Sequence, residues 1–391
     1  MNLIKNRKNS AETLKITSKY PTVSVIVPAK NEEKVIARLL RSLLKFDYPT
    51  SKMEILVIDD NSTDRTGEIC KEIASSNPGR IKVFRRIHAS TKAAALNNAL
   101  GFAQGALIAT FDADSLPRAD VLLNVVKYFD DPKVAGVQGT IYCSNSDENI
   151  LTRFISLERA IQYEIYQNGK DSLGLFVSLN GTCQFIKANV LRELGGWNEK
   201  NLAEDMELSL RIAEKNYKVR YASDVKTYEE SPNDINGVIK QRTRWFRGNI
   251  ENMIKFGRLL KKPASWIRLD AEIQLLGTFI VVLGVFNYFM AGWTFTLSTD
   301  QFLVGIMYTT SVLTLLFLAL AGLSLVFVSR PLKLVNLIWL PLIYMYWGLQ
   351  SFIALNAVFL IAFRRPSRWN KTQRSGKVTS EDAKKIANTV S

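Results

Sequence analysis

Two carboxylates one residue apart, Asp112 and Asp114 in "FDADS", are the residues of this sequence best suited to bind a metal ion. They follow an apolar run that predicts a buried strand, so both side chains can turn toward one cation at the strand end. Such oxygen ligands suit Mg²⁺ or Mn²⁺, which keep positions open for water and phosphate. A calcium loop is excluded, because the glycine and the closing glutamate of that loop are missing. No Walker glycine loop is present, so bound phosphates would rely on the metal and nearby cations.

A second acidic pair, Glu204 and Asp205, opens a predicted helix in "AEDMELSLR". The helix dipole favours acids in a first turn, which is a purely structural explanation for Glu204. Asp205 is the candidate general base, because transfer of a glycosyl or phosphoryl group onto a hydroxyl requires a positioned carboxylate.

Short apolar strands alternate with helical stretches before residue 120, which predicts parallel βαβ units and an α/β, doubly wound sheet. In such a sheet ligands bind at the carboxyl ends of the strands. Asp59 and Asp60 end the second strand, and "PAKNEE" ends the first. Strand-end acids often only cap the following turn, but three polar endings on one edge favour a shared pocket. The expected strands are 23–29, 53–60, 80–87 and 106–114, and the expected helices are 34–46, 66–74 and 93–103.

The composition of the 391 residues divides the chain into a mixed, charged part and a nearly uncharged part. Three apolar runs, at about 271–298, 302–329 and 334–363, each exceed the roughly 20 residues that cross a bilayer. The chain is therefore expected to be a multi-pass protein of the cell membrane. We assign five regions: an N-terminal tail (1–20), a catalytic domain (21–250), an interfacial amphipathic segment (251–269), a transmembrane region (270–363) and a basic tail (364–391).

The net charge of +15 comes largely from Lys and Arg that flank the apolar runs. This distribution follows the positive-inside rule and suits contact with anionic lipid headgroups, and it argues against a nucleic-acid partner. An apolar signal sequence is missing and the three cysteines fit no metal or disulfide pattern, so the catalytic domain is expected in the cytoplasm. Three full spans would place the basic tail outside, against the positive-inside rule. We therefore expect a cytoplasmic tail, with the run at 334–363, which contains Pro341 and Gly348, either a re-entrant hairpin or partly in the interface.

Six motifs in order resemble the membrane-bound, synthase-type family-2 glycosyltransferases, which include cellulose, hyaluronan and poly-N-acetylglucosamine synthases and relatives that glycosylate lipids. The motifs are "VSVIVPAKNEE", "VIDDNSTDRT", "KAAALNNAL", "FDADSLP", "GGW" with "AEDMELSLR", and "QRTRW". The resemblance covers roughly residues 20–250. It implies a GT-A fold that takes a nucleotide-diphosphate sugar and transfers the sugar with inversion.

The same resemblance implies a role for each matching residue. Asp112 and Asp114 match the metal and nucleotide motif, and Asp205 matches the catalytic base. A less specific match, "RWNKTQRSG", resembles a loop that covers the nucleotide in related synthases, with Trp369, Lys371 and Thr372 at its matching positions. Contacts to base, ribose or diphosphate are implied for Ala29, Glu32, Asp59, Asp60 and Lys92.

The "QRTRW" motif would form the acceptor site, together with Glu204. A flat indole such as that of Trp245 stacks on a sugar ring, while Gln241 and Arg244 can donate to hydroxyl and phosphate oxygens. The alternative is a tryptophan in the interfacial belt beside an arginine that faces headgroups.

We therefore expect a membrane-anchored inverting glycosyltransferase that uses Mg²⁺ or Mn²⁺ and extends a polysaccharide from a donor such as a UDP-sugar. One alternative is transfer of a single sugar to a polyprenyl phosphate or glycolipid. A second is an inactive nucleotide-binding scaffold or subunit of a larger synthase. The expected partners are the donor, a saccharide or lipid-linked acceptor, the bilayer and possible accessory subunits.

Overall fold

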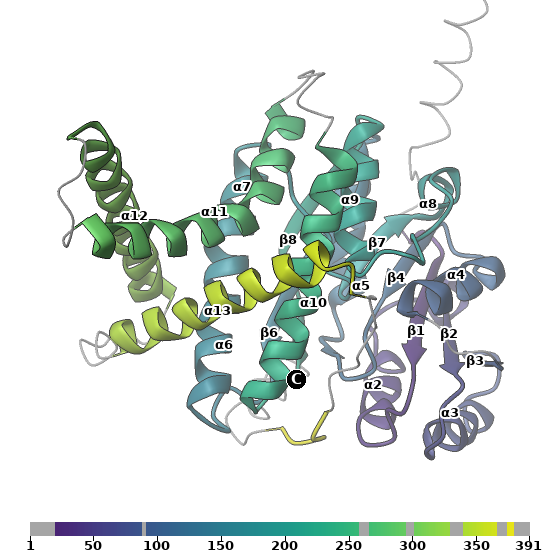
Figure 1. Ribbon diagram of the computed structural model, residues 1–391. Helices are drawn as coiled ribbons and strands as arrows, with labels where there is room; N and C mark the ends of the chain where they lie inside the picture. Colours follow the sequence, from purple (N-terminus) through teal and green to yellow (C-terminus); the bar gives the residue numbers. More distant parts are fainter. Residues whose placement is uncertain are drawn as a thin grey trace, which may run out of the picture.

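The fold is a mixed, eight-stranded sheet with helices on both faces, followed by three long helices (Figure 1). It is seen in a computed structural model that describes residues 20–87, 91–257, 266–294, 301–328, 339–365 and 374–378. The predicted N-terminal tail, most of the basic tail and the three loop residues Trp369, Lys371 and Thr372 lie outside the described residues.

The first half of the sheet confirms the predicted βαβ pattern. Strand β1 pairs in parallel with β2 on one side and β4 on the other, and β2 pairs in parallel with β3. Nearly all side chains of β1 and β2 are buried, as expected for β-branched runs covered on both faces. The elements of this half are β1 (Val23–Ala29), α2 (Ile36–Leu43), η1 (Thr50–Lys52), β2 (Met53–Asp60), α3 (Thr66–Ser75), β3 (Ile81–Arg86), α4 (Lys92–Phe102) and β4 (Leu107–Thr110).

Strand order reverses between β1 and β4, because β2 and β3 extend the sheet in one direction and β4 in the other. Right-handed crossovers then place α2 and α3 on one face and α4 on the opposite face, as Figure 1 shows. A crevice forms at the carboxyl ends of strands where the order reverses. The predicted strand-end acids therefore meet at one edge.

The second half of the sheet is not purely parallel, which the alternation before residue 120 did not predict. Strand β7 runs antiparallel to both β4 and β6, whereas β6 and β8 are parallel and β5 is antiparallel to β8. The elements are β5 (Leu116–Pro117), α5 (Val121–Val126), η2 (Lys127–Phe129), β6 (Val134–Cys143), α6 (Ile150–Ala160), the π-helix η3 (Ile161–Gln167), α7 (Asn168–Ser172), β7 (Gln184–Lys187), α8 (Ala188–Glu193), α9 (Glu204–Glu214) and β8 (Lys218–Glu229).

Helix α10 (Ile235–Phe256) is continuous through the boundary that we placed at residue 250. It begins where the Asp234 side chain accepts a hydrogen bond from the backbone N–H of Gly237, and it ends at Gly257. Of the predicted interfacial segment, 251–269, the first residues belong to α10 and the last ones to α11 (Trp266–Thr294). Residues 258–265 lie outside the described ranges.

Helices α12 (Gln301–Val328) and α13 (Trp339–Ala362) contain stretches, at Gln301–Val326 and Pro341–Ala362, that are long and apolar enough to cross a membrane. The alternative prediction of a re-entrant hairpin at 334–363 is wrong for the residues that the structure describes there, because α13 is one continuous helix. Pro341 lies in the first turn, where its missing N–H breaks no helical bond, and Gly348 does not interrupt the helix.

The long helices pack onto the catalytic domain. The first turns of α11 pack on it through an ion pair between Lys170 and Asp270 at 2.9 Å and through buried Ala271 and Leu275. Helix α13 packs against α6 and α10, with Phe154 in ring contact with Tyr346.

Candidate active site

One cavity of about 510 Å³ contains nearly all the predicted site residues. It runs from the carboxyl ends of β1 and β2 to helices α6, α10, α11 and α13. The predicted residues that line it are Ala29, Glu32, Asp60, Lys92, Asp112, Asp114, Glu204, Asp205, Gln241, Arg244 and Trp245. The sequence motifs, although far apart in the chain, therefore share one cavity.

Asp59 is the exception among the predicted residues that the structure describes, because it does not line this cavity. Its side chain is 1% exposed and accepts a hydrogen bond from the backbone N–H of Ser62 at 2.9 Å. Gly67 passes so close that a Cβ there would lie 2.7 Å from an Asp59 oxygen. Asp59 thus holds the turn after β2, whereas Asp60 lies in the cavity and pairs with Arg86 at 2.8 Å.

Three carboxylates meet where β4 and β8 end. One oxygen from each of Asp112, Asp114 and Glu229 lies within 4.8 Å of the other two. Burial raises the pKa of Glu229 to about 7, with further contributions from the negative charges of Asp114 and Asp112. A buried acidic cluster of this kind is stabilised by a cation, and three hard oxygen donors fit Mg²⁺ or Mn²⁺.

Among the described residues, three cations of the protein already pair with this cluster, the longest contact being that of Arg159 with Glu229 at 3.9 Å. Lys92 pairs with Asp112, and Arg374 pairs with Asp114 at 3.1 Å between Nε and the carboxylate oxygen. Lys92 is placed by the Thr91 hydroxyl, which caps the start of α4, and its ammonium group donates to the carbonyl of Gly181 at 2.9 Å. Burial alone would lower the pKa of Lys92, but the negative charges around it, above all Asp112, raise it overall.

Glu204 and Asp205 begin α9, as the sequence predicted. Burial raises the pKa of Glu204 to about 7, and the charge of Asp205 adds to this effect. Burial also raises the pKa of Asp205. A hydrogen bond from the backbone N–H of Met206 at 2.8 Å and the positive charge of Lys92 act in the opposite direction but do not cancel this rise. An aspartate with a raised pKa in a cavity is suited to accept a proton near neutral pH.

Gly181 brings the two acidic groups together, and the sequence analysis missed it. Its φ angle is +82°, and a Cβ at this position would lie 3.1 Å from an Asp205 oxygen and 3.2 Å from the Lys92 nitrogen. Only glycine fits this backbone conformation and this space without strain. The signal available in the sequence was a lone "NGT", which is too common to be specific.

The "QRTRW" motif lies in the middle of α10, not in an irregular segment. Gln241, Arg244 and Trp245 are spaced three and four residues apart, so they share one helix face, and this face lines the cavity. Helix α10 can approach the start of α9 closely because Gly248 has no Cβ. A Cβ there would lie only 2.6 Å from the Cβ of Ala203. The motif and Asp205 therefore line the same cavity, where the charge of Arg244 acts on Asp205.

A polar cluster that the sequence analysis did not predict joins α10 to α6 and α13. Arg242 pairs with Glu158, and its guanidinium lies 4.6 Å from the centre of the Trp245 ring. Glu158 also accepts hydrogen bonds from Tyr346 at 3.1 Å and from Gln350 at 2.8 Å. Because these residues come from three helices, no local sequence pattern indicates the cluster.

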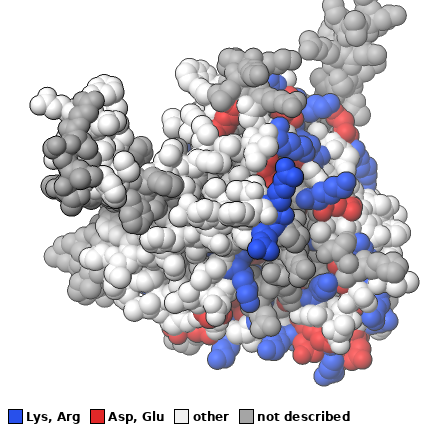
Figure 2. Space-filling view, in the orientation of Figure 1, with Lys and Arg blue, Asp and Glu red and all other residues white. Residues whose placement is uncertain are grey.

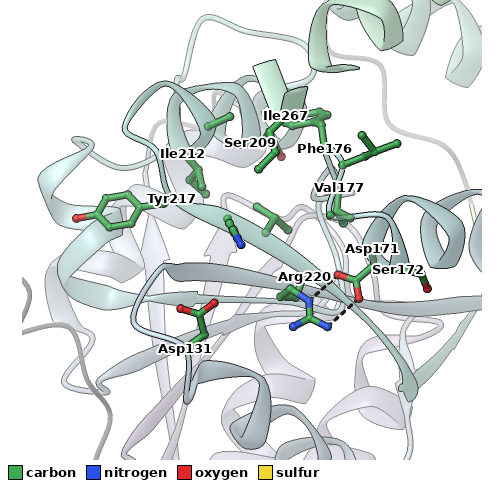
Figure 3. Close-up of a pocket in the computed structure, with 15 residues that line it drawn as sticks. Asp131, Asp171, Ser172, Phe176, Val177, Ser209, Ile212, Tyr217, Arg220 and Ile267 are labelled. Atoms are coloured by element: carbon green, nitrogen blue, oxygen red, sulfur yellow. Dashed lines mark hydrogen bonds and ion pairs between the residues drawn. The ribbon is translucent and has the colours of Figure 1, made fainter. Parts of the chain in front are cut away.

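A second cavity, of about 250 Å³, shares no lining residue with the first (Figure 3). Its most polar feature is Asp171, which accepts two hydrogen bonds from Arg220 at 2.7 and 3.0 Å and one from the backbone N–H of Tyr221. Because both oxygens of this carboxylate accept hydrogen bonds that link α7 to β8, we assign no chemistry to this cavity.

Comparison with known proteins identifies the family. The model of "Glycosyltransferase like family 2" matches residues 21–248. The chain is 31% identical over 310 residues to "Probable glycosyltransferase YdaM" of Bacillus subtilis, covering 78% of this chain and 70% of that protein. It is 35% identical over 249 residues to "Beta-monoglucosyldiacylglycerol synthase" of Nostoc sp., covering 63% of this chain and 53% of that protein. The chain thus spans about half the length of the second relative.

Structure comparison agrees on the fold. A mannosyltransferase of Pyrobaculum calidifontis, PcManGT, solved with GDP-Man and Mn²⁺, superposes with a TM-score of 0.61 at 20% identity, over 91% of this chain and 93% of that one. At this identity the similarity supports the GT-A fold only. Neither sequence relative named above is called a cellulose or hyaluronan synthase, so that narrower resemblance is not established. Because the family model matches more than half of its residues, the chain belongs to glycosyltransferase family 2 and is an enzyme of that family with a GT-A fold.

Proposed function

We propose that the enzyme transfers one sugar, with inversion, from a nucleotide-diphosphate sugar to a hydroxyl group of a lipid in the membrane. The observation that carries this proposal is the single cavity, which joins the strand-end acids to Asp205, Trp245 and a residue of the apolar helix α13, Gln350. Donor, base and membrane acceptor can therefore meet in one space.

The donor would occupy the end formed by β1, β2 and β4. Ala29, Glu32 and Asp60 line this end and would contact the nucleoside, and Asp112 and Asp114, with Glu229, would hold Mg²⁺ or Mn²⁺. When bound, the metal would neutralise charge on the diphosphate leaving group. Lys92 lies between the metal acids and Asp205 and can supply a second positive charge to the same group.

Asp205 would take the proton of the acceptor hydroxyl as that oxygen attacks the sugar. Its carboxylate faces the cavity beside Gly181, while Lys92 and Arg244 provide nearby positive charge. Asp205→Asn keeps the shape but removes the base, so turnover should fall by about 10²–10⁴. If donor affinity fell in proportion, Asp205 would be a donor ligand instead of the base.

Two observations favour a lipid over a growing polysaccharide as the acceptor. The cavity extends to Gln350, within the apolar stretch of α13, and a relative at 35% identity is named a glucosyldiacylglycerol synthase. The polysaccharide remains the second candidate, because the "QRTRW" motif is typical of synthases that add many sugars. Product size after feeding labelled donor to membranes separates the two, since a ladder or a high polymer would rule out single addition.

The membrane placement proposed here uses the contact between Arg374 and Asp114. Because Arg374 follows α13 and touches the catalytic domain, an even number of crossings must separate the two. Helices α12 and α13 supply two crossings, which returns the basic tail to the cytoplasmic side, as the positive-inside rule favours. Figure 2 agrees in outline: the region of the long helices is almost free of charge, and Lys and Arg gather beside it.

The decisive experiment is a screen of the purified protein against nucleotide sugars, reading release of nucleoside diphosphate with and without Mn²⁺. We expect release from one donor class, dependent on metal and lost in Asp114→Ala. Release that needs no metal and survives in Asp114→Ala would contradict the proposal, and no release from any donor would favour an inactive subunit.

A further inference from the structure

Four polar side chains in the acceptor half of the cavity hydrogen-bond to none of the residues that the structure describes. Gln241, Arg244 and Asn249 come from α10, and Gln162 comes from the π-helix η3 on the opposite wall. Gln241 is 5% exposed, and the Nε of Arg244 is buried. Buried polar groups without protein partners lose free energy unless a ligand or water satisfies them.

The position of Gln162 strengthens this interpretation. Seven residues of η3 form a π-helix inside an otherwise α-helical segment, an arrangement that is frequent at functional sites. The wider turn places Gln162 and Tyr163 in the cavity wall, where the Tyr163 hydroxyl accepts a hydrogen bond from Asn180 at 2.9 Å. No described residue makes such a hydrogen bond with Gln162, so its side chain can bind a ligand.

The charges of this half of the cavity nearly cancel. Glu158 neutralises Arg242, and the charge of Arg244 acts on Glu204 and Asp205. Arg159, a further arginine of the cavity wall, pairs with Glu229 at 3.9 Å, so each of these described arginines already lies near a carboxylate, and a lipid phosphate would add negative charge beside these acids. Carboxamides, by contrast, both donate and accept hydrogen bonds, which is what a hydroxyl group requires.

We infer that Gln162, Gln241 and Asn249, with Arg244, bind the uncharged, hydroxyl-bearing head of a lipid acceptor, a glycerol or a sugar, and that the site discriminates against lipid phosphates. The inference rests on the proposed function and specifies its acceptor class. The lipid tail would lie toward α13, because Gln350 of that apolar helix reaches Glu158 at the same end of the cavity.

The test uses the purified full chain with the donor found in the screen and compares four acceptors. Dioleoylglycerol, its monoglucosyl derivative and undecaprenyl phosphate are supplied in phosphatidylcholine vesicles, and cellobiose is supplied in solution. We expect the neutral lipids to raise nucleoside-diphosphate release at least several-fold above the acceptor-free rate, and undecaprenyl phosphate to raise it little. Stronger stimulation by undecaprenyl phosphate overturns the inference, and equal molar efficiency of cellobiose overturns its lipid part.

Substitutions then assign the site. Gln162→Leu and Asn249→Leu should each raise the KM for the neutral lipid by about 10-fold, the effect of one lost hydrogen bond, with a much smaller change in the KM for the donor. Gln104→Leu, at an exposed position between α4 and β4, is the matched control and should leave both constants unchanged. Unchanged acceptor KM in both variants overturns the inference. Release of nucleoside diphosphate by the wild type is measured alongside without acceptor and with each acceptor, because its absence under all of these conditions contradicts the proposed function itself.

Discussion

The guanidinium of Arg374 lies 3.1 Å from a carboxylate oxygen of Asp114, so a residue beyond the last long helix contacts the proposed metal site. Its neighbours hold the segment in place, because the backbone N–H groups of Ser375 and Gly376 donate to the Glu230 carboxylate at 2.9 and 3.1 Å. A metal ion that binds Asp114 must share or displace this contact. The segment after α13 and the metal are therefore coupled through one carboxylate.

This coupling predicts that Arg374→Ala binds Mn²⁺ more tightly in the absence of donor. One charge-assisted hydrogen bond no longer competes for Asp114, so the affinity should rise by about 10-fold, measured by titration calorimetry or by the electron paramagnetic resonance of free Mn²⁺. Arg38→Ala is the matched control, since Arg38 pairs with Glu230 at 3.1 Å and no contact with Asp114 is described for it. Equal affinity in the wild type and Arg374→Ala would show that the contact does not compete with metal.

Gly181→Ala should reduce turnover far more than it reduces stability. The new methyl group would lie against Asp205 and Lys92, and a shift of these groups by a fraction of an ångström should lower kcat by about 10–100-fold. Gly174→Ala is the control: Gly174 has a similar φ of +66°, but no atom lies within 4 Å of its Cβ position. Both variants should lose about 1–2 kcal/mol of stability. Equal turnover in the two variants would argue against the tight packing of the catalytic groups.

The sequence predicted the donor half of the site well because its residues follow strands. Buried β-branched runs predict β1 and β2 at their observed bounds, and whatever follows a parallel strand must lie at the ligand edge. Glu229 also ends a strand, but β8 mixes polar and apolar residues along its twelve positions, so the sequence of β8 does not indicate a buried parallel strand. The sequence analysis therefore missed Glu229 because β8 was not recognised as a strand, although a glutamate is an ordinary metal ligand.

The acceptor half could be predicted only in part, because it is built by packing between helices. The resemblance of the "QRTRW" motif grouped Gln241, Arg244 and Trp245 as an acceptor site, but no local pattern pairs Glu158 with Gln350 on a helix far along the chain. The same limit explains why the sequence did not indicate that one helix, α10, continues past residue 250. The composition becomes more basic there, yet no proline interrupts α10, and neither Gly237 nor Gly248 ends the helix before Gly257.

The buried Glu204 makes folding stability depend on pH in a defined direction. Its pKa is about 7 in the folded protein against 4.5 ordinarily, so the native state keeps a proton that the unfolded chain releases. The resulting stabilisation, at most about 3 kcal/mol, is fully present below pH 4.5 and is lost as the pH rises through about 7. Glu204→Gln cannot release a proton, so its unfolding temperature should fall less between pH 5 and pH 8 than that of the wild type.

The control for this measurement is Glu72→Gln, at an exposed position on α3, which should keep the pH dependence of the wild type. Thermal unfolding in detergent, followed by tryptophan fluorescence, gives the required temperatures. Parallel pH curves for the wild type and Glu204→Gln would show that Glu204 is ionised in the native state throughout this range.

Substitution of Trp245 distinguishes between two roles for this residue, acceptor binding and membrane anchoring, because the two roles predict opposite results. Its ring is 37% exposed, lines the cavity and carries the guanidinium of Arg242 at 4.6 Å on its face. If the ring positions the acceptor, Trp245→Ala should lower the ratio of sugar transfer to donor hydrolysis by about 10-fold, since loss of an aromatic stacking contact costs on the order of 1 kcal/mol or more. Trp245→Phe should retain part of the transfer, because it keeps a flat apolar face.

The matched control is Trp266→Ala, because the Trp266 side chain at the start of α11 is 78% exposed and outside the cavity. This variant should keep the wild-type ratio of transfer to hydrolysis, even if it binds membranes less tightly. Both reactions are measured in one assay, as labelled lipid product and as free labelled sugar. If Trp245→Ala and Trp266→Ala both keep the ratio and both weaken membrane association, then Trp245 is an interfacial anchor and the acceptor binds elsewhere in the cavity.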